Sequence, residues 1–141
     1  MVALLLAGGV QRVIWLPLAY DPAGSAGEPR YGLLDPDGTV RPAGDAVRSI
    51  AVAAGRVSSI QGVRSASVSG VAFGAAGRTT MILRSDADAA AIVAAPPGQG
   101  ATARTAGGQQ VPWGAGGRRL GQEPVLLSVP AAPGRALRLI G

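Results

Sequence analysis

Residues 31–46 read YGLLDPDGTVRPAGDA, and this stretch predicts a tight turn followed by the start of a helix. In Asp35-Pro36-Asp37-Gly38 the proline presets φ and the glycine can adopt a positive φ, as a tight turn requires. Pro42 suits the first helical turn because its fixed φ is already helical. Asp45 then places a negative charge where the helix dipole favours one. We therefore expect a helix that begins near Pro42 and ends at Gly55.

The segment before this stretch contains two apolar runs. Val2–Ala7 fits the last turns of a helix, with Gly8 and Gly9 free to adopt the left-handed conformation at its C-terminus. Val13–Leu18 is continuously apolar, which is typical of a parallel strand covered on both faces. This run is far shorter than the ~20 residues that span a bilayer, and the N-terminal run lacks the basic region of a signal peptide. Residues 1–55 are thus expected to form a helix end, a buried strand, a long loop and a helix.

Beyond Val57 the pattern changes to short runs of high β-propensity separated by glycine-rich breaks. Turn signals recur about every eight to twelve residues, the spacing expected of an antiparallel sandwich. The expected strands are Ser67–Phe73, Thr79–Arg84, Ala91–Ala94, Ala101–Thr105, Pro124–Val129 and Arg135–Ile140. We expect no helix in this part of the chain. The predicted fold class is therefore mostly β: a small antiparallel β-sandwich (56–141) preceded by a strand–loop–helix unit (1–55).

The amino-acid composition excludes several kinds of catalytic site. The chain has no cysteine and no histidine, so a disulfide and a Ser-His-Asp or Cys-His arrangement are impossible within it. The net charge of +5 comes with arginine as the sole basic residue. Only Arg118 and Arg119 are adjacent, which favours dispersed solvating charges over a nucleic-acid-binding motif. We expect no cofactor, no metal ion and no nucleic acid as ligands.

This order of parts resembles the C-terminal end of the clan A (β/α)8-barrel glycoside hydrolases, many of which carry a C-terminal β-sandwich. In that family the last barrel strand often ends near a tryptophan, and Val13–Leu18 contains Trp15. The next loop tends to contain an aromatic residue with Gly-Leu, a polar turn with Gly, and a Pro-Ala that opens the last helix. Tyr31-Gly32-Leu33, Asp37-Gly38 and Pro42-Ala43 correspond to these features. Glu123–Ser128 resembles a closing strand of the accessory domain, although leucine replaces the aromatic usual there.

The resemblance implies that residues 1–55 are the last strand–loop–helix unit of a (β/α)8 barrel and that residues 56–141 are its C-terminal β-sandwich domain. It also implies a carbohydrate ligand and a missing barrel portion as partner, with secretion or a periplasmic location following from the resemblance alone. Glycoside hydrolysis normally needs two carboxylates, and the family's glutamates follow the fourth and seventh barrel strands. If Val13–Leu18 is the eighth strand, both would precede Met1. Glu28 and Glu123 match neither position, so we predict no catalytic residue, and we expect the isolated chain to be inactive.

Trp15 and Tyr20 are the candidate substrate-binding residues. At the C-terminal end of a barrel strand, Trp15 would line the active-site face, and its indole ring could stack on the C–H surface of a sugar. The alternative is a core tryptophan in a buried strand. Tyr20 lies in the following loop, where it would either contact a sugar or pack on the barrel rim. Trp113 is expected to cover the sandwich core, with an exposed carbohydrate platform as the alternative.

Two other classes of function remain open on the sequence. One is a free-standing β-sandwich that binds carbohydrate or mediates adhesion, with residues 1–55 as an appendage. The other is a structural domain that stabilises a partner chain. Val13–Leu18 distinguishes these possibilities, because an orphan barrel strand would expose an unpaired apolar edge that favours aggregation.

Overall fold

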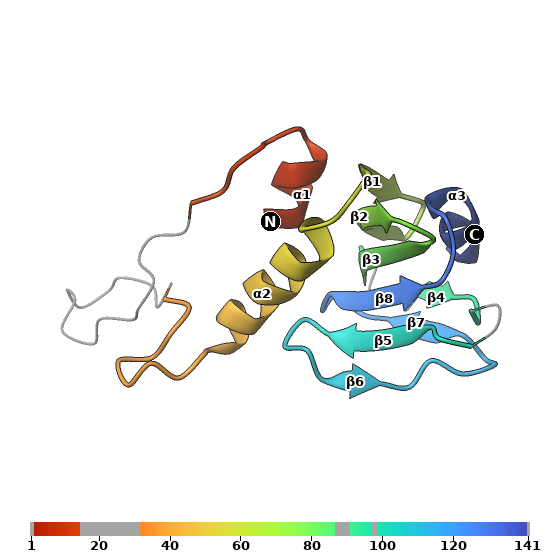
Figure 1. Ribbon diagram of the computed structural model, residues 1–141. Helices are drawn as coiled ribbons and strands as arrows, with labels where there is room; N and C mark the ends of the chain where they lie inside the picture. The colour runs from red at the N-terminus through yellow and green to blue at the C-terminus, as the bar shows by residue number, and fades with distance from the viewer. Residues whose placement is uncertain (1, 15–31, 87–90, 97–98, 141) are drawn as a thin grey trace.

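The computed structural model describes residues 2–14, 32–86, 91–96 and 99–140, and in them two antiparallel sheets follow two helices (Figure 1). The larger sheet has the strand order β1-β2-β3-β8-β5-β6, and the smaller sheet pairs β4 with β7. The elements are α1 (Val2–Ala7), α2 (Pro42–Ala54), β1 (Ser59–Arg64), β2 (Val68–Ala75), β3 (Arg78–Ser85), β4 (Ala91–Val93), β5 (Thr102–Thr105), β6 (Gln110–Val111), β7 (Arg118–Leu120), β8 (Val125–Val129), α3 (Pro133–Ala136) and the 3-10 helix η1 (Leu137–Leu139).

One face of the large sheet packs against the small sheet and the C-terminal helical turns. Alternate residues of a strand point to opposite faces, so Met81 and Leu83 of β3 lie on the same side as Leu127 of β8. They are buried together with Val93 of β4 and Leu120 of β7. The two sheets therefore share one apolar core, and the fold is mostly β and sandwich-like, as predicted.

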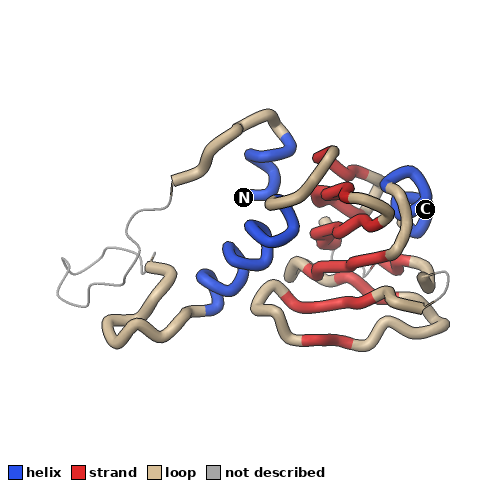
Figure 2. Tube along the Cα trace, in the orientation of Figure 1, coloured by secondary structure: helices blue, strands red, loops and turns tan. Residues whose placement is uncertain are grey.

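The opposite face of the large sheet is covered in part by α1 and α2. Val71 and Phe73 of β2 are buried in a second apolar cluster with Ala3 of α1. Ile50 and Ala53 of α2 pack on the same cluster. Figure 2 shows α1 and α2 beside the strands on one side of the molecule and α3 on the other. The N-terminal helices and the β-sheet thus share a core instead of being joined only by a linker.

The two predicted helices and the predicted turn are confirmed. α2 begins at Pro42 and ends at Ala54, directly before Gly55. α1 covers Val2–Ala7, and Gly9 after it has a φ of 91°. In the turn, the N–H of Gly38 donates a hydrogen bond of 2.9 Å to the carbonyl oxygen of Asp35, and Gly38 has a φ of 85°. These features depend on local sequence, which is why they could be predicted.

The expected strands correspond to β2, β3, β4, β5 and β8, but the prediction for Arg135–Ile140 was wrong. That segment forms the end of α3 and η1 instead of a strand. Pro133 occupies the first turn of α3, where its fixed φ favours a helical start. Leu137 and Leu139 still pack against the core, from helical turns. The expectation of no helix after Val57 is corrected by the same finding.

The structure does not confirm the barrel unit predicted for residues 1–55. Val13 and Ile14 lie in no strand, and the side chain of Ile14 is 74% exposed. The rest of the predicted strand, residues 15–18, lies outside the described part of the chain. All strand pairs among the described residues are antiparallel, so Val13 and Ile14 have no parallel neighbour there to pair with.

Candidate functional site

A groove is lined by α2 and by strands β3, β5 and β8 of the large sheet. Its volume is about 470 Å³. α2 forms its wall, strands β3, β5 and β8 form its floor, and the loop after β5 adds to the lining. The lining residues are Asp45, Arg48, Ser49, Val52, Ala53, Thr80, Thr102, Arg104, Gly107, Gly108, Leu126 and Ser128. We call this feature the α2–sheet groove. Polar and charged side chains make up much of its surface, in contrast to the apolar cluster farther along the same face.

The floor of the α2–sheet groove is built by the register of three strands. Thr80 of β3 lies opposite Ser128 of β8, which in turn lies opposite Thr102 of β5. Their hydroxyl-bearing side chains therefore form one row across the sheet. The next row on this face continues from Leu126 to Arg104. The residues between these rows point to the other face and are buried in the core, so the floor is fixed by packing beneath it.

The hydroxyl groups of the floor are connected to a guanidinium group. Thr80 Oγ1 and Ser128 Oγ lie 3.4 Å apart, within hydrogen-bond distance. Arg78 donates from one terminal nitrogen to Ser128 Oγ at 3.1 Å and to the carbonyl oxygen of Gly100 at 3.3 Å. Because Arg78 supplies a donor, the Ser128 hydroxyl hydrogen is free to point toward another acceptor.

The charge balance of the α2–sheet groove is positive. Arg48 forms an ion pair with Asp45 one turn earlier on α2, and Asp45 is the acidic residue of the lining. Arg104 on β5 is exposed and forms no ion pair with a described residue. A guanidinium carries five N–H donors, so the contact with Asp45 leaves part of Arg48 unoccupied. The groove can therefore offer guanidinium donors from its wall and its floor at once.

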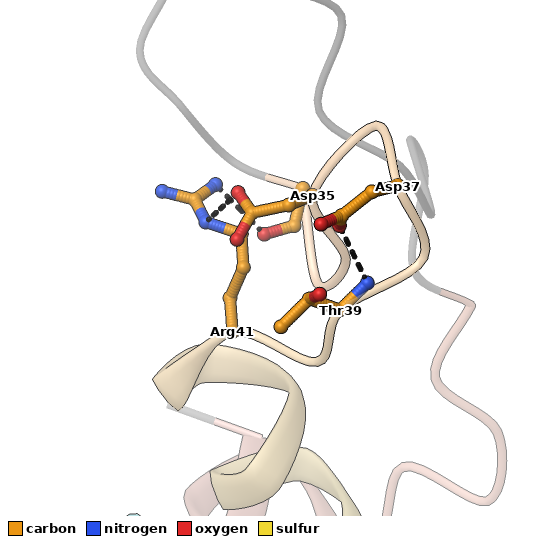
Figure 3. A network of polar contacts seen from close by, with 5 residues as sticks. Asp35, Asp37, Thr39 and Arg41 are labelled. Carbon is orange, nitrogen blue, oxygen red and sulfur yellow. Dashed lines mark hydrogen bonds and ion pairs between the residues drawn. The ribbon is translucent and has the colours of Figure 1, made fainter.

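A second polar cluster lies in the turn before α2 (Figure 3). Arg41 Nε lies 3.5 Å from Asp35 Oδ1, and a terminal nitrogen of Arg41 donates to the carbonyl oxygen of Gly32 at 3.1 Å. The N–H of Thr39 donates to Asp37 Oδ1 at 2.9 Å, and this hydrogen bond lowers the pKa of Asp37 below its ordinary value. Both carboxylates thus have partners within the same segment, and the contact of Asp35 with Arg41 ties the turn to the start of α2.

The structure leaves the predicted substrate-binding residues undecided. Trp15 and Tyr20 lie outside the described part of the chain, as does Glu28. Trp113 covers the core as expected. Its ring packs against the apolar core that the two sheets share, and its Nε1 donates to the carbonyl oxygen of Ala94 at 3.1 Å. Glu123 lies exposed in the loop before β8.

The sequence reasoning missed the α2–sheet groove altogether. Its floor joins Thr80, Thr102 and Ser128, which are far apart in the chain and meet only through strand pairing. In the predicted strands, polar residues alternate with apolar ones. This alternation indicates that the polar side chains face solvent, but it does not indicate a binding site.

The described residues, 2–14, 32–86, 91–96 and 99–140, offer neither a metal site nor a membrane-spanning helix. There, no group of three Asp or Glu side chains is arranged to hold a metal ion. Likewise, no helix in that part of the chain is long and apolar enough to cross a membrane.

Comparison with protein-family models finds no match, and a search of curated proteins finds no match either.

Proposed function

We propose that the chain is the C-terminal, non-catalytic part of a glycoside hydrolase, with residues 1–55 as the terminal unit of its catalytic barrel and residues 56–141 forming the accessory β domain. Two kinds of observation support this proposal. One is the family-like stretch from Tyr31 to Ala46. The other is the distribution of exposed apolar side chains, which carries most of the weight.

Exposed large apolar side chains gather in the N-terminal part. Among the described residues seven such side chains are exposed, and six of them precede residue 55: Leu4, Leu5, Val10, Ile14, Val40 and Val52. The seventh is Ile92 in β4. Contiguous exposed apolar surface marks an interaction site in a soluble protein, and Leu4 and Leu5 are neighbours on α1. Five of the six, all except Val52, do not line the α2–sheet groove, so the N-terminal part presents apolar surface that a barrel could cover.

The two N-terminal helices also leave an apolar hollow between them. It is lined by Val2, Leu6, Val13, Val47, Ile50 and Ala51 and has a volume of about 200 Å³. Barrel helices are apolar on the side that faces the strands, because that side packs on the barrel wall. A neighbouring barrel element could fill this hollow with apolar side chains.

The shared core between helices and sheet favours an accessory domain over a tethered module. Ala3 and Ile50 contact the same cluster as Phe73, so the N-terminal part cannot swing freely relative to the β domain without opening that cluster. A free-standing carbohydrate-binding domain with a loose appendage would not need this packing. In the proposed enzyme it fixes the β domain against the barrel.

The solution behaviour of the isolated chain tests the proposal. We expect the chain to self-associate and to bind an apolar dye, because its barrel-facing surface is uncovered. The double variant Leu4→Gln/Ile14→Gln should shift it toward monomer, since these side chains are 57% and 74% exposed. Ile92→Gln is the matched control, because Ile92 is 58% exposed but lies in the β domain; it should leave the self-association unchanged. Analytical ultracentrifugation distinguishes the outcomes.

The coding sequence upstream of codon 1 gives a second and independent test. The proposal expects a reading frame, either continuous or separate, that encodes barrel-like strands with two glutamates after two of them. Co-expression of that product with this chain should give a stable complex that hydrolyses glycosides. A monomeric, cooperatively folding isolated chain together with the absence of such a reading frame would overturn the proposal in favour of a separate module.

A further inference from the structure

We propose that the α2–sheet groove binds an anionic saccharide, one that carries carboxylate or sulfate groups. This inference deepens the proposed function, on which its choice of a saccharide rests. It assigns to the β domain a ligand-binding role that is distinct from its packing role. Three features of the groove support it: a row of hydroxyl groups, guanidinium groups from α2 and from the sheet, and apolar side chains in the lining.

The hydroxyl row suits a polyhydroxylated ligand. Thr80, Ser128 and Thr102 lie side by side on neighbouring strands, and neighbouring strands are ~4.8 Å apart. This spacing is comparable to the length of one sugar ring, so successive hydroxyl side chains can meet successive sugar hydroxyls. Each side-chain hydroxyl can both donate and accept, as a sugar hydroxyl requires. The row therefore offers a repeated hydrogen-bonding surface on a rigid sheet.

The guanidinium groups favour a negatively charged ligand. Arg104 extends from the floor and Arg48 from the wall on α2, and both line the groove. A guanidinium matches a carboxylate or a sulfate with two parallel hydrogen bonds. Arg48 is already positioned by its ion pair with Asp45, whereas Arg104 has no ion-pair partner among the described residues. An anionic group would supply Arg104 with the ion-pair partner that it lacks among the described residues and could also accept from the N–H groups of Arg48 that Asp45 does not occupy, whereas a neutral sugar would leave Arg104 without such a partner.

Apolar surface completes the lining. Val52 on α2 is 77% exposed and Leu126 on β8 is partly buried, and both line the groove. The C–H face of a sugar ring can pack on such surface while its substituents reach the polar rows. Val52 thus belongs to the groove, whereas Leu4 and Ile14 do not line it.

Calorimetric titration of the full chain tests the inference. The probes are an oligogalacturonate, a sulfated oligosaccharide of similar length, a neutral cello-oligosaccharide and polyglutamate. We expect one or both anionic saccharides to bind, at least ~10-fold more tightly than the neutral one, and more weakly as salt is added, since salt screens exposed charges. Comparison of the uronate and sulfate arms identifies which anionic group the groove prefers.

Variants locate the binding in the groove. Arg104→Gln and Arg48→Gln should each weaken binding of the anionic saccharide about 10-fold, as expected for loss of roughly one charge-assisted pair. Thr80→Val should weaken it about threefold through loss of one hydroxyl. Arg138→Gln is the matched control, because Arg138 is an exposed arginine in η1 and does not line the groove; its effect should stay below about twofold.

Three results would overturn the inference: no binding of any saccharide, equal binding of polyglutamate, or equal weakening by Arg138→Gln and Arg104→Gln. In these cases the arginines act only as dispersed charges. The proposed function has a separate readout, the assembly of the chain through Leu4 and Ile14. Failure of saccharide binding with intact assembly would therefore remove the groove proposal alone, and loss of assembly with intact binding would remove the barrel proposal alone.

Discussion

The indole Nε1 of Trp113 donates a hydrogen bond of 3.1 Å to the backbone carbonyl oxygen of Ala94 and so ties the segment between β6 and β7 to the end of β4. The N–H of Ala94 in turn donates to the carbonyl oxygen of Leu139 at 2.8 Å. Both Trp113 and Leu139 pack against the apolar core that the two sheets share. Three segments that are distant in sequence thus close the core at one place.

Trp113 should therefore contribute to stability through both its ring and its N–H group. We expect Trp113→Phe to lower the free energy of unfolding by about 1 kcal/mol, because it removes the hydrogen bond and keeps most of the packing. Trp113→Ala should lower it by about 2–3 kcal/mol, since a half-buried ring is lost. Urea denaturation followed by far-UV circular dichroism measures both. An unchanged Trp113→Ala protein would instead support the carbohydrate-platform alternative.

Gly70 lies in β2, which is paired with β1 on one side and β3 on the other, and this position should not tolerate a side chain. A Cβ at this position would clash with the carbonyl oxygen of Ile82 and lie 2.9 Å from Leu83 Cδ2. We expect Gly70→Ala to lower the free energy of unfolding by about 2 kcal/mol, because a packed core resists added volume.

Gly62 in neighbouring β1 is the matched control for Gly70, because a Cβ there would meet nothing within 4 Å. Gly62→Ala should be neutral or should stabilise the protein by up to about 1 kcal/mol, since glycine weakens a strand interior. Chemical denaturation of Gly70→Ala and Gly62→Ala under the same conditions measures the change in the free energy of unfolding at each position. Similar effects at both positions would contradict the packing described for the β2–β3 pair.

The hydrogen bond from Thr39 to Asp37 predicts an acid-sensitive contact. Because this bond lowers the pKa of Asp37 in the folded chain, its stabilising contribution is present above the unfolded-state pKa and is lost as the pH falls through the folded-state pKa. We expect the Thr39 amide resonance to titrate below the ordinary aspartate range in an NMR pH series. Asp37→Asn should abolish that titration step. A step that persists in this variant would assign the transition to another carboxyl group.

Local signals explain which elements could be predicted from the sequence. α2 was predictable because Pro42, Asp45 and Gly55 mark its ends within the segment itself. β1 was missed because its half-buried residues Ile60 and Val63 are three positions apart, which breaks the alternation of a strand. β1 is held by pairing with β2 along its whole length, and that pairing is not visible in the β1 sequence.

The C-terminal error and the missed groove have a common physical cause. Leu137 and Leu139 alternate as in a strand, but Pro133 starts helical turns and the core accepts both leucines from there. Likewise, the arginine and hydroxyl residues of the α2–sheet groove are ordinary exposed residues until strand register brings them together. Tertiary contacts decided both cases, and a single sequence records them only indirectly.

Gly44 gives a test of how the family-like stretch is packed. Glycine is one of the weakest helix formers, so replacement by alanine inside a helix normally stabilises a protein by up to about 1 kcal/mol. At Gly44 in α2, however, a Cβ would lie 2.5 Å from the carbonyl oxygen of Leu33 and 2.9 Å from Val40 Cγ1. Gly44 is buried, and the turn before the helix lies directly on it. Gly44→Ala should therefore lower the free energy of unfolding by about 1–2 kcal/mol, opposite in sign to the usual effect.

Gly134 in α3 provides the matched control, because a Cβ there would meet nothing within 4 Å. Gly134→Ala should follow the usual helix preference and stabilise the chain by up to about 1 kcal/mol. Thermal and urea denaturation of the pair measure the difference in sign. If Gly44→Ala stabilised the protein as Gly134→Ala does, the turn would not rest on α2. The packing of Leu33 and Val40 on the first turn of α2 would then have to be abandoned.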